Sequence, residues 1–332
     1  MNTSSVQRID AIKDFPQHLK GCVVAIGNFD GVHRGHQAVL DVALKEADTA
    51  GVPAVVLTFE PHPRTVFKPD SPVFRLTPAP LKAELAGYLG FSAVVELPFT
   101  RDFAQQSAEA FVRDVLIAGL GINRVITGFN FHFGKDRQGS PEFLKEAGER
   151  LGFAVTVVEP FEDEGSELVS SSRIRSCIGN GDIAEACGLL GYRYAVQADV
   201  QRGKQLGRTL GFPTANMALP PETGLRTGIY AVRFRRADGS LHDGVASFGY
   251  RPTVDDSGTP LLETYIFDFD RQIYGETCTV IFVAHLRDEL KFDSLEPMVE
   301  QMTRDAHQAR ELLQNLRPLS ALDRSLAFDE DD

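Results

Sequence analysis

The sequence predicts an α/β domain followed by an antiparallel β domain that ends in one long helix. Up to about residue 190, short apolar runs alternate with helical stretches, which is typical of a parallel sheet with helices on both faces. After Tyr192, strand-like runs follow one another with only turn residues between them, which predicts an antiparallel barrel or sandwich. A length of 332 residues suits two domains, since one domain takes roughly 100–200 residues.

The elements of the first domain follow from apolar runs and capping residues. Compact, β-branched runs predict strands at Cys22–Ile26, Ala54–Thr58, Arg124–Thr127 and Ala154–Val158. Helical periodicity predicts helices at His36–Ala50, from Ser107 to about Gly119, and from Pro141 to just before Gly152. Gly51 is the expected residue after the first helix, and Ser140 with Pro141 gives an N-cap and an N1 proline. A capping box at Asp182 opens a further helix that Gly191 closes.

The second domain is predicted from strands separated by turns. The strands are expected at Tyr194–Val200, Gly228–Arg235, Gly244–Phe248, Leu262–Phe269 and Thr277–Ala284. A long helix begins after Ser294, tolerates Pro297 in its first turn, and carries apolar residues on one face up to Leu316. Residues 319–332 end in the acidic run DEDD, and we expect this tail to be disordered.

Composition excludes several classes of protein. The net charge is −12, with 34 basic and 46 acidic residues, so we expect no nucleic-acid partner. No run of about 18 apolar residues is present, so we expect no membrane-spanning helix, and the N-terminus lacks the apolar core of a signal peptide. The four cysteines lie far apart without a CxxC pair, which predicts reduced thiols and a cytoplasmic location.

The segment from Ala25 to His36 (AIGNFDGVHRGH) is the strongest indication of a phosphate site. A buried strand runs into a glycine-rich turn, and a helix begins at or near His36, so backbone N–H groups and the helix dipole can bind an anion. His33 and His36 can present both imidazoles to one phosphate, and Gly35 removes a side chain that would block it. Two surface histidines or two zinc ligands are the alternatives, although no nearby segment offers a third ligand.

Several motifs together resemble one enzyme family. The run His33-Arg34-Gly35-His36 is similar to the HxGH signature of nucleotidyltransferases, and the wider GNFDGVHRGH with TFEPHP (Thr58–Pro63) resembles the bacterial bifunctional riboflavin kinase/FAD synthetase family. In the second half, GFPTAN (Gly211–Asn216) resembles the PTAN motif of riboflavin kinases. The segments ETYIFDF (Glu263–Phe269) and LRDE (Leu286–Glu289) match that family too.

The resemblance implies two activities on two domains. Residues 1–185 would form an α/β nucleotidyltransferase domain, Rossmann-like and of the HxGH type, that makes FAD and pyrophosphate from FMN and ATP. Residues 186–318 would form an antiparallel β-barrel riboflavin kinase domain, with its C-terminal helix, that makes FMN from riboflavin and ATP. Mg²⁺ would accompany ATP. The alternatives are a monofunctional adenylyltransferase whose barrel only binds, and a flavin-binding regulator without catalysis.

In the adenylyltransferase reaction the nucleophile is the FMN phosphate, which is already an anion and needs no base. The site must instead supply positive charge and hydrogen-bond donors, a role that fits His33 and His36. The run VSSSRIR resembles the family's SSTRIR, and its Arg173 can bind a phosphate, although a serine N-cap with solvated arginines is the plainer interpretation. The further expected ATP and phosphate contacts are Gly27, Phe29, Asp30, Gly35, Asn130, Ser171 and Ser172.

In the kinase reaction the nucleophile is the neutral ribityl hydroxyl, so a carboxylate base would help. Glu263 matches the family's catalytic glutamate. Thr214 and Asn216 lie two apart, so on a strand both face ATP–Mg²⁺, although turn chemistry after Pro213 is the alternative. Contacts with ATP–Mg²⁺ are also expected at Gly203 and Gly207, and contacts with flavin at Arg287 and Phe292.

Overall fold

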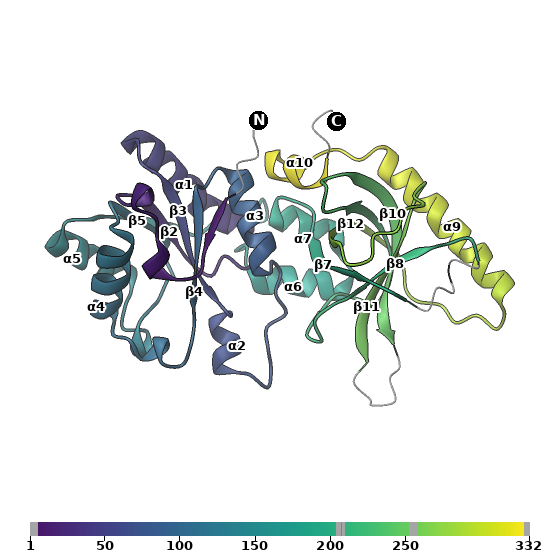
Figure 1. Ribbon diagram of the computed structural model, residues 1–332, viewed down its shortest axis with the longest axis horizontal. Helices are drawn as coiled ribbons and strands as arrows, with labels where there is room; N and C mark the ends of the chain where they lie inside the picture. Colours follow the sequence, from purple (N-terminus) through teal and green to yellow (C-terminus); the bar gives the residue numbers. More distant parts are fainter. Residues whose placement is uncertain (1–5, 204–206, 208–209, 252–257, 329–332) are drawn as a thin grey trace. The chain divides into compact units, whose positions relative to one another are not determined.

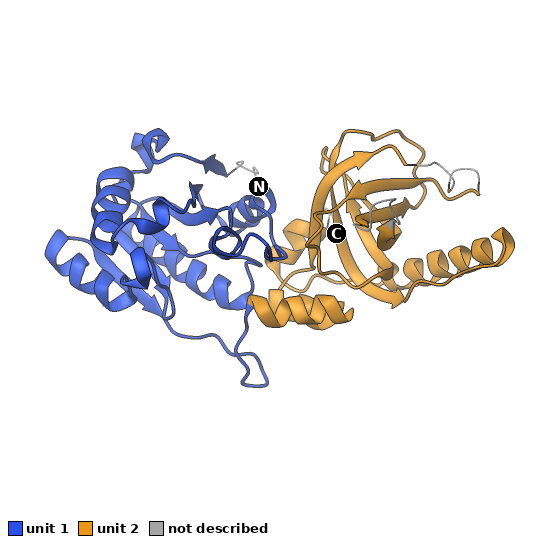
Figure 2. Ribbon diagram, turned by 90° about the horizontal axis from the view of Figure 1, so that it is seen from below, with its two compact units in different colours: residues 1–170 blue, residues 171–332 orange. Residues whose placement is uncertain are grey.

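The computed structural model describes residues 6–203, 207, 210–251 (Arg251 by its backbone alone) and 258–328. It divides into two compact units, residues 1–170 and 171–332, which Figure 2 shows in blue and orange. The boundary between the units precedes the predicted domain boundary at residues 185 and 186, because helices α6 (Ser171–Asn180) and α7 (Ile183–Leu190) belong to the second unit. None of the described helices is both long enough and apolar enough to cross a bilayer.

The first unit is a parallel sheet with helices around it (Figure 1). Its strands are β1 (Gln7–Ile9), β2 (Val23–Ile26), β3 (Ala54–Glu60), β4 (Ala93–Pro98), β5 (Arg124–Gly128) and β6 (Ala154–Val158). All adjacent pairs run parallel, in the order β1-β4-β3-β2-β5-β6. The α-helices are α1 (Arg34–Ala50), α2 (Pro63–Phe67), α3 (Ala79–Leu89), α4 (Ala108–Ala110) and α5 (Pro141–Leu151), and the π-helix η4 (Phe111–Leu120) continues α4. Short 3₁₀ turns are η1 (Ile12–Asp14), η2 (Gln17–Leu19), η3 (Phe103–Gln105) and η5 (Lys135–Arg137).

Local capping chemistry explains where the helices of this unit begin and end. Gly51 ends α1 at φ 64°, a left-handed conformation that costs glycine little, and its N–H binds the carbonyls of the last turn. Ser140 caps α5 by accepting the N–H of Phe143, with Pro141 in the first turn. These predictions are confirmed. The patterns above do not predict β1, β4 or α3.

The second unit is a closed antiparallel barrel. Its strands are β7 (Ala195–Gln201), β8 (Thr214–Ala218), β9 (Gly228–Arg235), β10 (Leu241–Arg251), β11 (Thr259–Ile266) and β12 (Thr277–Arg287). They pair in the order β10-β11-β8-β7-β12-β9, and β9 pairs with β10 to close the ring. The predicted α/β fold, the predicted barrel and the predicted C-terminal helix are therefore all confirmed.

Alternation along the barrel strands separates an apolar interior from an outer face. Large buried side chains fill the interior, among them Tyr230, Phe234, Phe248, Leu262 and Phe282. Helix α9 (Leu295–Gln314) begins after Ser294 as predicted. Its Ala309 and Leu313 pack on the outer face against Ala231 and Phe267.

The expected disorder from residue 319 onward is wrong for residues 321–327. These residues form helix α10 (Ala321–Ala327), which Ser320 caps. The buried Asp323 binds Arg193, near the start of the barrel chain, by an ion pair and by the Arg193 N–H. Leu322, Leu326 and Phe328 are also buried, so the C-terminal segment completes the core of the second unit. The DEDD run itself lies outside the described residues.

Candidate active sites

The strand order places the first candidate site at the carboxyl ends of β2 and β5. From β2 the chain continues to β3 and β4 on one side, then returns to β5 and β6 on the other side. Ligands of open α/β sheets bind at such a reversal point, where the loops after the two strands separate. The loop after β2 carries residues 27–33, and the turn after β5 carries Asn130, so both predicted segments lie at this point.

His33 and His36 form a stacked pair at the N-terminus of α1. Helix α1 begins at Arg34, two residues earlier than expected, because His33 is itself the N-cap and its Nδ1 accepts the N–H of His36 at 3.3 Å. The ring centroids of the two histidines lie 3.6 Å apart, and the rings of Phe29 and His36 pack in a T-shaped arrangement with centroids 5.4 Å apart. When Nδ1 accepts this hydrogen bond, it carries no proton, and Nε2 is the N–H donor of the His33 ring.

The environment of His36 keeps its imidazole neutral. Burial is the main cause, and the positive charge of Lys82 and that of His33 when it is protonated add to it, so that the pKa of His36 lies well below the usual 6.5. Its Nδ1 is buried and has no hydrogen-bond partner among the described residues. His36 therefore suits the hydrogen-bonding part of the role predicted from the sequence, which asked for positive charge and hydrogen-bond donors.

The loop before α1 adopts a conformation that few residues accept. Phe29 has φ 46° and Val32 has φ 38°, and both values lie in the left-handed region that non-glycine residues avoid. Close packing also restricts two glycines. A Cβ on Gly27 would lie 2.9 Å from the Phe29 ring, and one on Gly35 would lie 3.2 Å from the His33 ring. Larger residues at these two positions would push the aromatic rings away.

Asp30 joins this loop to the segment before α3. Its Oδ1 accepts the N–H groups of Leu76 at 3.0 Å and Thr77 at 3.1 Å, and Arg75 approaches it at 3.4 Å. These partners give the buried Asp30 a structural role, and its predicted contact with ATP stays a prediction.

Sequence reasoning missed the buried charges behind the loop. Lys82, in α3, is only 1% exposed and binds Glu60, which Arg75 also binds through two hydrogen bonds. Burial would raise the pKa of Glu60, but Arg75 and Lys82 outweigh it and lower the pKa to about 2. A signal for Lys82 exists in the sequence, since it shares its helical face with Leu85, Ala86 and Leu89 and is the one cation on that apolar stripe.

The other predicted phosphate ligands lie in two places. Asn130 is exposed in the turn after β5, with its side-chain oxygen near the Gly128 backbone. Ser171 and Ser172 begin α6 in the second unit, where Arg173 binds Glu185 at 2.8 Å. Their contacts with phosphate stay predictions.

The predicted kinase residues meet on the outer face of the barrel. Asn216 on β8 lies directly opposite Glu263 on β11, and such pairs hold their Cβ atoms about 4.5–5.5 Å apart. The amide nitrogen of Asn216 donates to the carbonyl oxygen of Thr214 at 3.1 Å and to its hydroxyl at 3.2 Å. Thr214 and Asn216 therefore share a strand face, as predicted, and that face also carries Glu263.

Gly203 and Gly207 adjoin the same residues. A Cβ on Gly203 would lie 2.6 Å from Cγ of Asn216, so only glycine allows this approach. The carbonyl oxygen of Gly207 accepts the N–H of Phe212 at 2.8 Å. A Cβ on Gly207 would lie 3.8 Å from the methyl group of Thr214. The two glycines, Thr214 and Asn216 thus form one cluster.

The two predicted flavin residues lie near α9. Arg287 ends β12, and its guanidinium makes two hydrogen bonds, of 2.9 and 2.6 Å, to Asp305 of α9. Phe292 is half-buried in the segment before α9. The Asp305 partner explains how Arg287 ties the barrel to α9, and contact with flavin stays a prediction for both residues.

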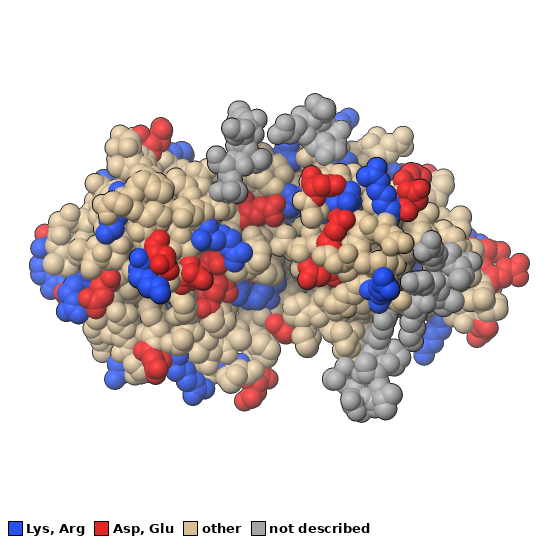
Figure 3. All heavy atoms as spheres, viewed as in Figure 1, with Lys and Arg blue, Asp and Glu red and all other residues tan. Residues whose placement is uncertain are grey.

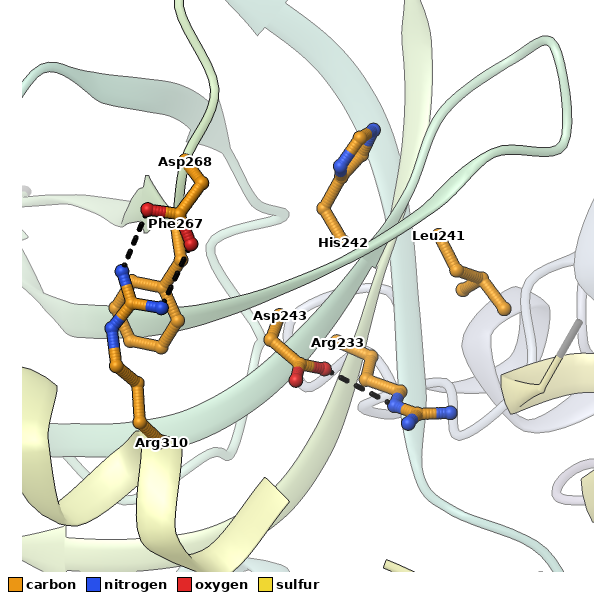
Figure 4. A pocket seen from close by; sticks show the side chains of 7 residues that line it. All are labelled: Arg233, Leu241, His242, Asp243, Phe267, Asp268 and Arg310. Atoms are coloured by element: carbon orange, nitrogen blue, oxygen red, sulfur yellow. Dashed lines mark hydrogen bonds and ion pairs between the residues drawn. The ribbon is translucent and has the colours of Figure 1, made fainter. Parts of the chain in front are cut away.

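A shallow polar cavity of about 360 Å³ lies elsewhere on the barrel unit (Figure 4). Arg310 pairs with Asp268 in it, and Arg233 pairs with Asp243, so its charges compensate each other. No predicted site residue lines this cavity. Basic and acidic side chains are also interspersed on the face of the molecule shown in Figure 3.

Comparisons with known proteins agree with this two-site arrangement. The FAD synthetase family model matches residues 15–173, and the riboflavin kinase model matches residues 190–313. A bifunctional riboflavin kinase/FMN adenylyltransferase of Pseudomonas fluorescens is 40% identical over 90% of this chain and 94% of its own length. The protein of that name from Escherichia coli K12 is 35% identical over 94% of this chain and 99% of its own length.

One solved structure matches almost the whole chain. It is the crystal structure of a protein from Streptococcus pneumoniae that is described as a macrolide-efflux protein. Its TM-score is 0.79 at 32% identity, covering 94% of this chain and 100% of that one. With both family models matched in order and relatives aligned over most of their length, the chain belongs to the family of bifunctional riboflavin kinases/FMN adenylyltransferases.

Proposed function

We propose that the chain carries out two ATP-dependent transfers at two separate sites. The barrel would phosphorylate riboflavin to FMN, and the α/β domain, predicted as residues 1–185, would adenylylate FMN to FAD with release of pyrophosphate. The observation that carries this proposal is the pair of separate clusters, a donor-rich helix N-terminus in one unit and a carboxylate beside hard oxygen donors in the other. Each cluster suits the nucleophile of one reaction.

At the adenylyltransferase site, the residues would bind and stabilise phosphate charge. His33 and His36 would donate hydrogen bonds to the phosphates of ATP, with the N-terminus of α1 behind them. Ser171, Ser172 and Arg173, which begin α6, stay predicted phosphate ligands from the resemblance. No group at this site has to accept a proton, because the attacking phosphate of FMN is an anion.

At the kinase site, Glu263 would accept the proton of the ribityl 5′-hydroxyl. Mg²⁺ bound with ATP would neutralise the charge of the phosphates. The side-chain oxygens of Thr214 and Asn216 fit that ion, because hard oxygen donors suit Mg²⁺ and the Asn216 amide is oriented by its bonds to Thr214. The backbone at Gly203 and Gly207 would lie against the phosphates.

The small-molecule partners would be riboflavin, FMN, FAD and ATP. A cytoplasmic location, and the absence of nucleic-acid and membrane partners, stay predictions from composition and cysteine pattern.

Incubation of the protein with riboflavin, ATP and Mg²⁺, followed by chromatography, tests the proposal. Both FMN and FAD should form. If FAD forms only when FMN is supplied, the protein is a monofunctional adenylyltransferase. If neither riboflavin nor FMN is converted, the protein is a flavin-binding protein without catalysis.

A further inference from the structure

The Nζ atom of Lys82 has its full set of hydrogen-bond partners. It lies 3.0 Å from the carbonyl oxygen of Asn28, 3.0 Å from Oγ1 of Thr58 and 3.1 Å from Oε1 of Glu60. An ammonium group has three N–H donors, and these three acceptors occupy all of them. Lys82 is also buried, so it acts through these partners and through its charge rather than by touching a substrate.

Two further residues, Thr77 and Arg75, also hold the phosphate loop (residues 28–32). The N–H of Gly31 donates to Oγ1 of Thr77 at 2.8 Å, and that hydroxyl donates to the carbonyl oxygen of Phe29 at 3.4 Å. Arg75 binds Glu60 at 2.7 Å and Asp30 at 3.4 Å. Lys82, Glu60, Arg75 and Asp30 thus form a chain of alternating charges that ends in the loop.

The phosphate loop needs such support because its backbone is unfavourable. Left-handed φ values at residues such as Phe29 and Val32 persist only where surrounding contacts over-determine them. The loop leads directly to His33, so its position sets where the stacked histidines lie relative to β2.

We propose that Lys82 is a positioning residue for adenylyl transfer, which fixes the phosphate loop through the Asn28 carbonyl and Glu60. This inference rests on the proposed function of the histidine site. A buried ammonium is costly, and an apolar side chain of similar length would fill the same space without a charge. In this structure the Lys82 ammonium compensates the charge of Glu60 and binds the carbonyl oxygen of Asn28 in the loop.

Replacing Lys82 with methionine tests this role, because methionine is also long and unbranched. In Lys82→Met, kcat for FMN adenylylation should fall by about 10–10², as expected when a supporting contact is lost, while the KM for ATP changes less. Riboflavin phosphorylation should stay at the wild-type rate. Lys82→Arg should recover part of the loss, because it keeps a charged donor.

Arg8→Met is the matched control in the same unit. It removes the cation of the Arg8–Glu96 pair on β1 and β4, at the far edge of the sheet from β2. This variant should keep normal adenylyl transfer. An equal fall of kcat in Arg8→Met and Lys82→Met would overturn the proposal, because the loss would then follow stability alone.

Two more variants separate the possible failures. If His36→Ala leaves FAD formation intact, the histidine site and this inference both fail. If His36→Ala is impaired while folded Lys82→Met turns over normally, only the inference fails.

If Lys82→Met does not fold, Thr77→Val decides, since it removes the hydroxyl that binds Gly31 without leaving a buried charge. A fall of kcat by about tenfold at an unchanged unfolding midpoint would support the role of the loop contacts, and normal turnover would overturn it.

Discussion

Replacing Asp323 with asparagine tests whether α10 is part of the folded barrel unit. The Asp323 carboxylate is completely buried and accepts the N–H of Arg193 at 2.8 Å and the N–H of Leu319 at 2.9 Å. It also forms an ion pair with the Arg193 guanidinium, which is itself 7% exposed. Asparagine keeps the volume but leaves that guanidinium buried without a counter-charge.

The loss of one partner of a buried ion pair costs about 3–5 kcal/mol. For a unit of this size, each kcal/mol lowers the unfolding midpoint by roughly 2–4 °C, so Asp323→Asn should unfold about 10 °C below wild type. Glu300→Gln is the control, because it removes an exposed ion pair with Arg304 on α9 and should shift the midpoint by less than about 2 °C.

Thermal unfolding followed by circular dichroism, with riboflavin kinase activity recorded after each temperature step, measures the effect. The midpoint of kinase inactivation should fall together with the spectroscopic midpoint. A shift in Asp323→Asn as small as that of the control would refute the reasoning, since α10 would then contribute nothing to the barrel unit.

Three further variants test the two sites and their charges. His36→Ala should slow FMN adenylylation by about 10²–10³, measured as FAD formed from supplied FMN, with riboflavin phosphorylation unchanged. Glu263→Gln should lower kinase kcat by about 10²–10⁴ with near-normal FAD formation from FMN, and near-normal kinase turnover would remove Glu263 from the mechanism. Because the pKa of Glu60 falls to about 2 in the folded protein, its ion pairs stabilise the fold above pH 4.5 and are lost progressively as the pH falls toward 2. Urea unfolding should therefore show a loss of about 3 kcal/mol over this range that Glu60→Gln lacks, and identical pH profiles would contradict the assignment.

Features set by neighbours in the sequence could be predicted, and features set by distant pairs could not. Gly51 and Ser140 act on the helix beside them, and the alternation that places Thr214 and Asn216 on one face lies within one strand. The sequence predicts disorder where α10 lies, because an acidic tail is typical of solvated chain. Its burial depends on Arg193, which lies 130 residues earlier in the chain.

The same distinction holds for the phosphate site. The two histidines are visible in the sequence because they are three residues apart. The stacking of the two rings and the lowered pKa of His36 are not visible, because they depend on the fold, on burial and on the charge of Lys82 from another helix. Glu60 belongs to a recognised motif, but its partners Arg75 and Lys82 are 15 and 22 residues away, and only the fold brings the three together.

In the proposed function the carboxylates of Asp30 and Glu263 have different roles, and the two nucleophiles explain the difference. Asp30 lies in the phosphate loop, yet backbone N–H groups and Arg75 bind its carboxylate, so it is held as a structural anion rather than as a base. An adenylyl transfer to an anionic phosphate needs no base, so a tethered carboxylate costs that reaction nothing. Glu263 lies half-buried on the outer face of the barrel, beside the Asn216 amide, where a neutral hydroxyl nucleophile would need a proton acceptor. In the proposed function, the difference between the two nucleophiles therefore accounts for a structural role of Asp30 in one unit and a proton-accepting role of Glu263 in the other.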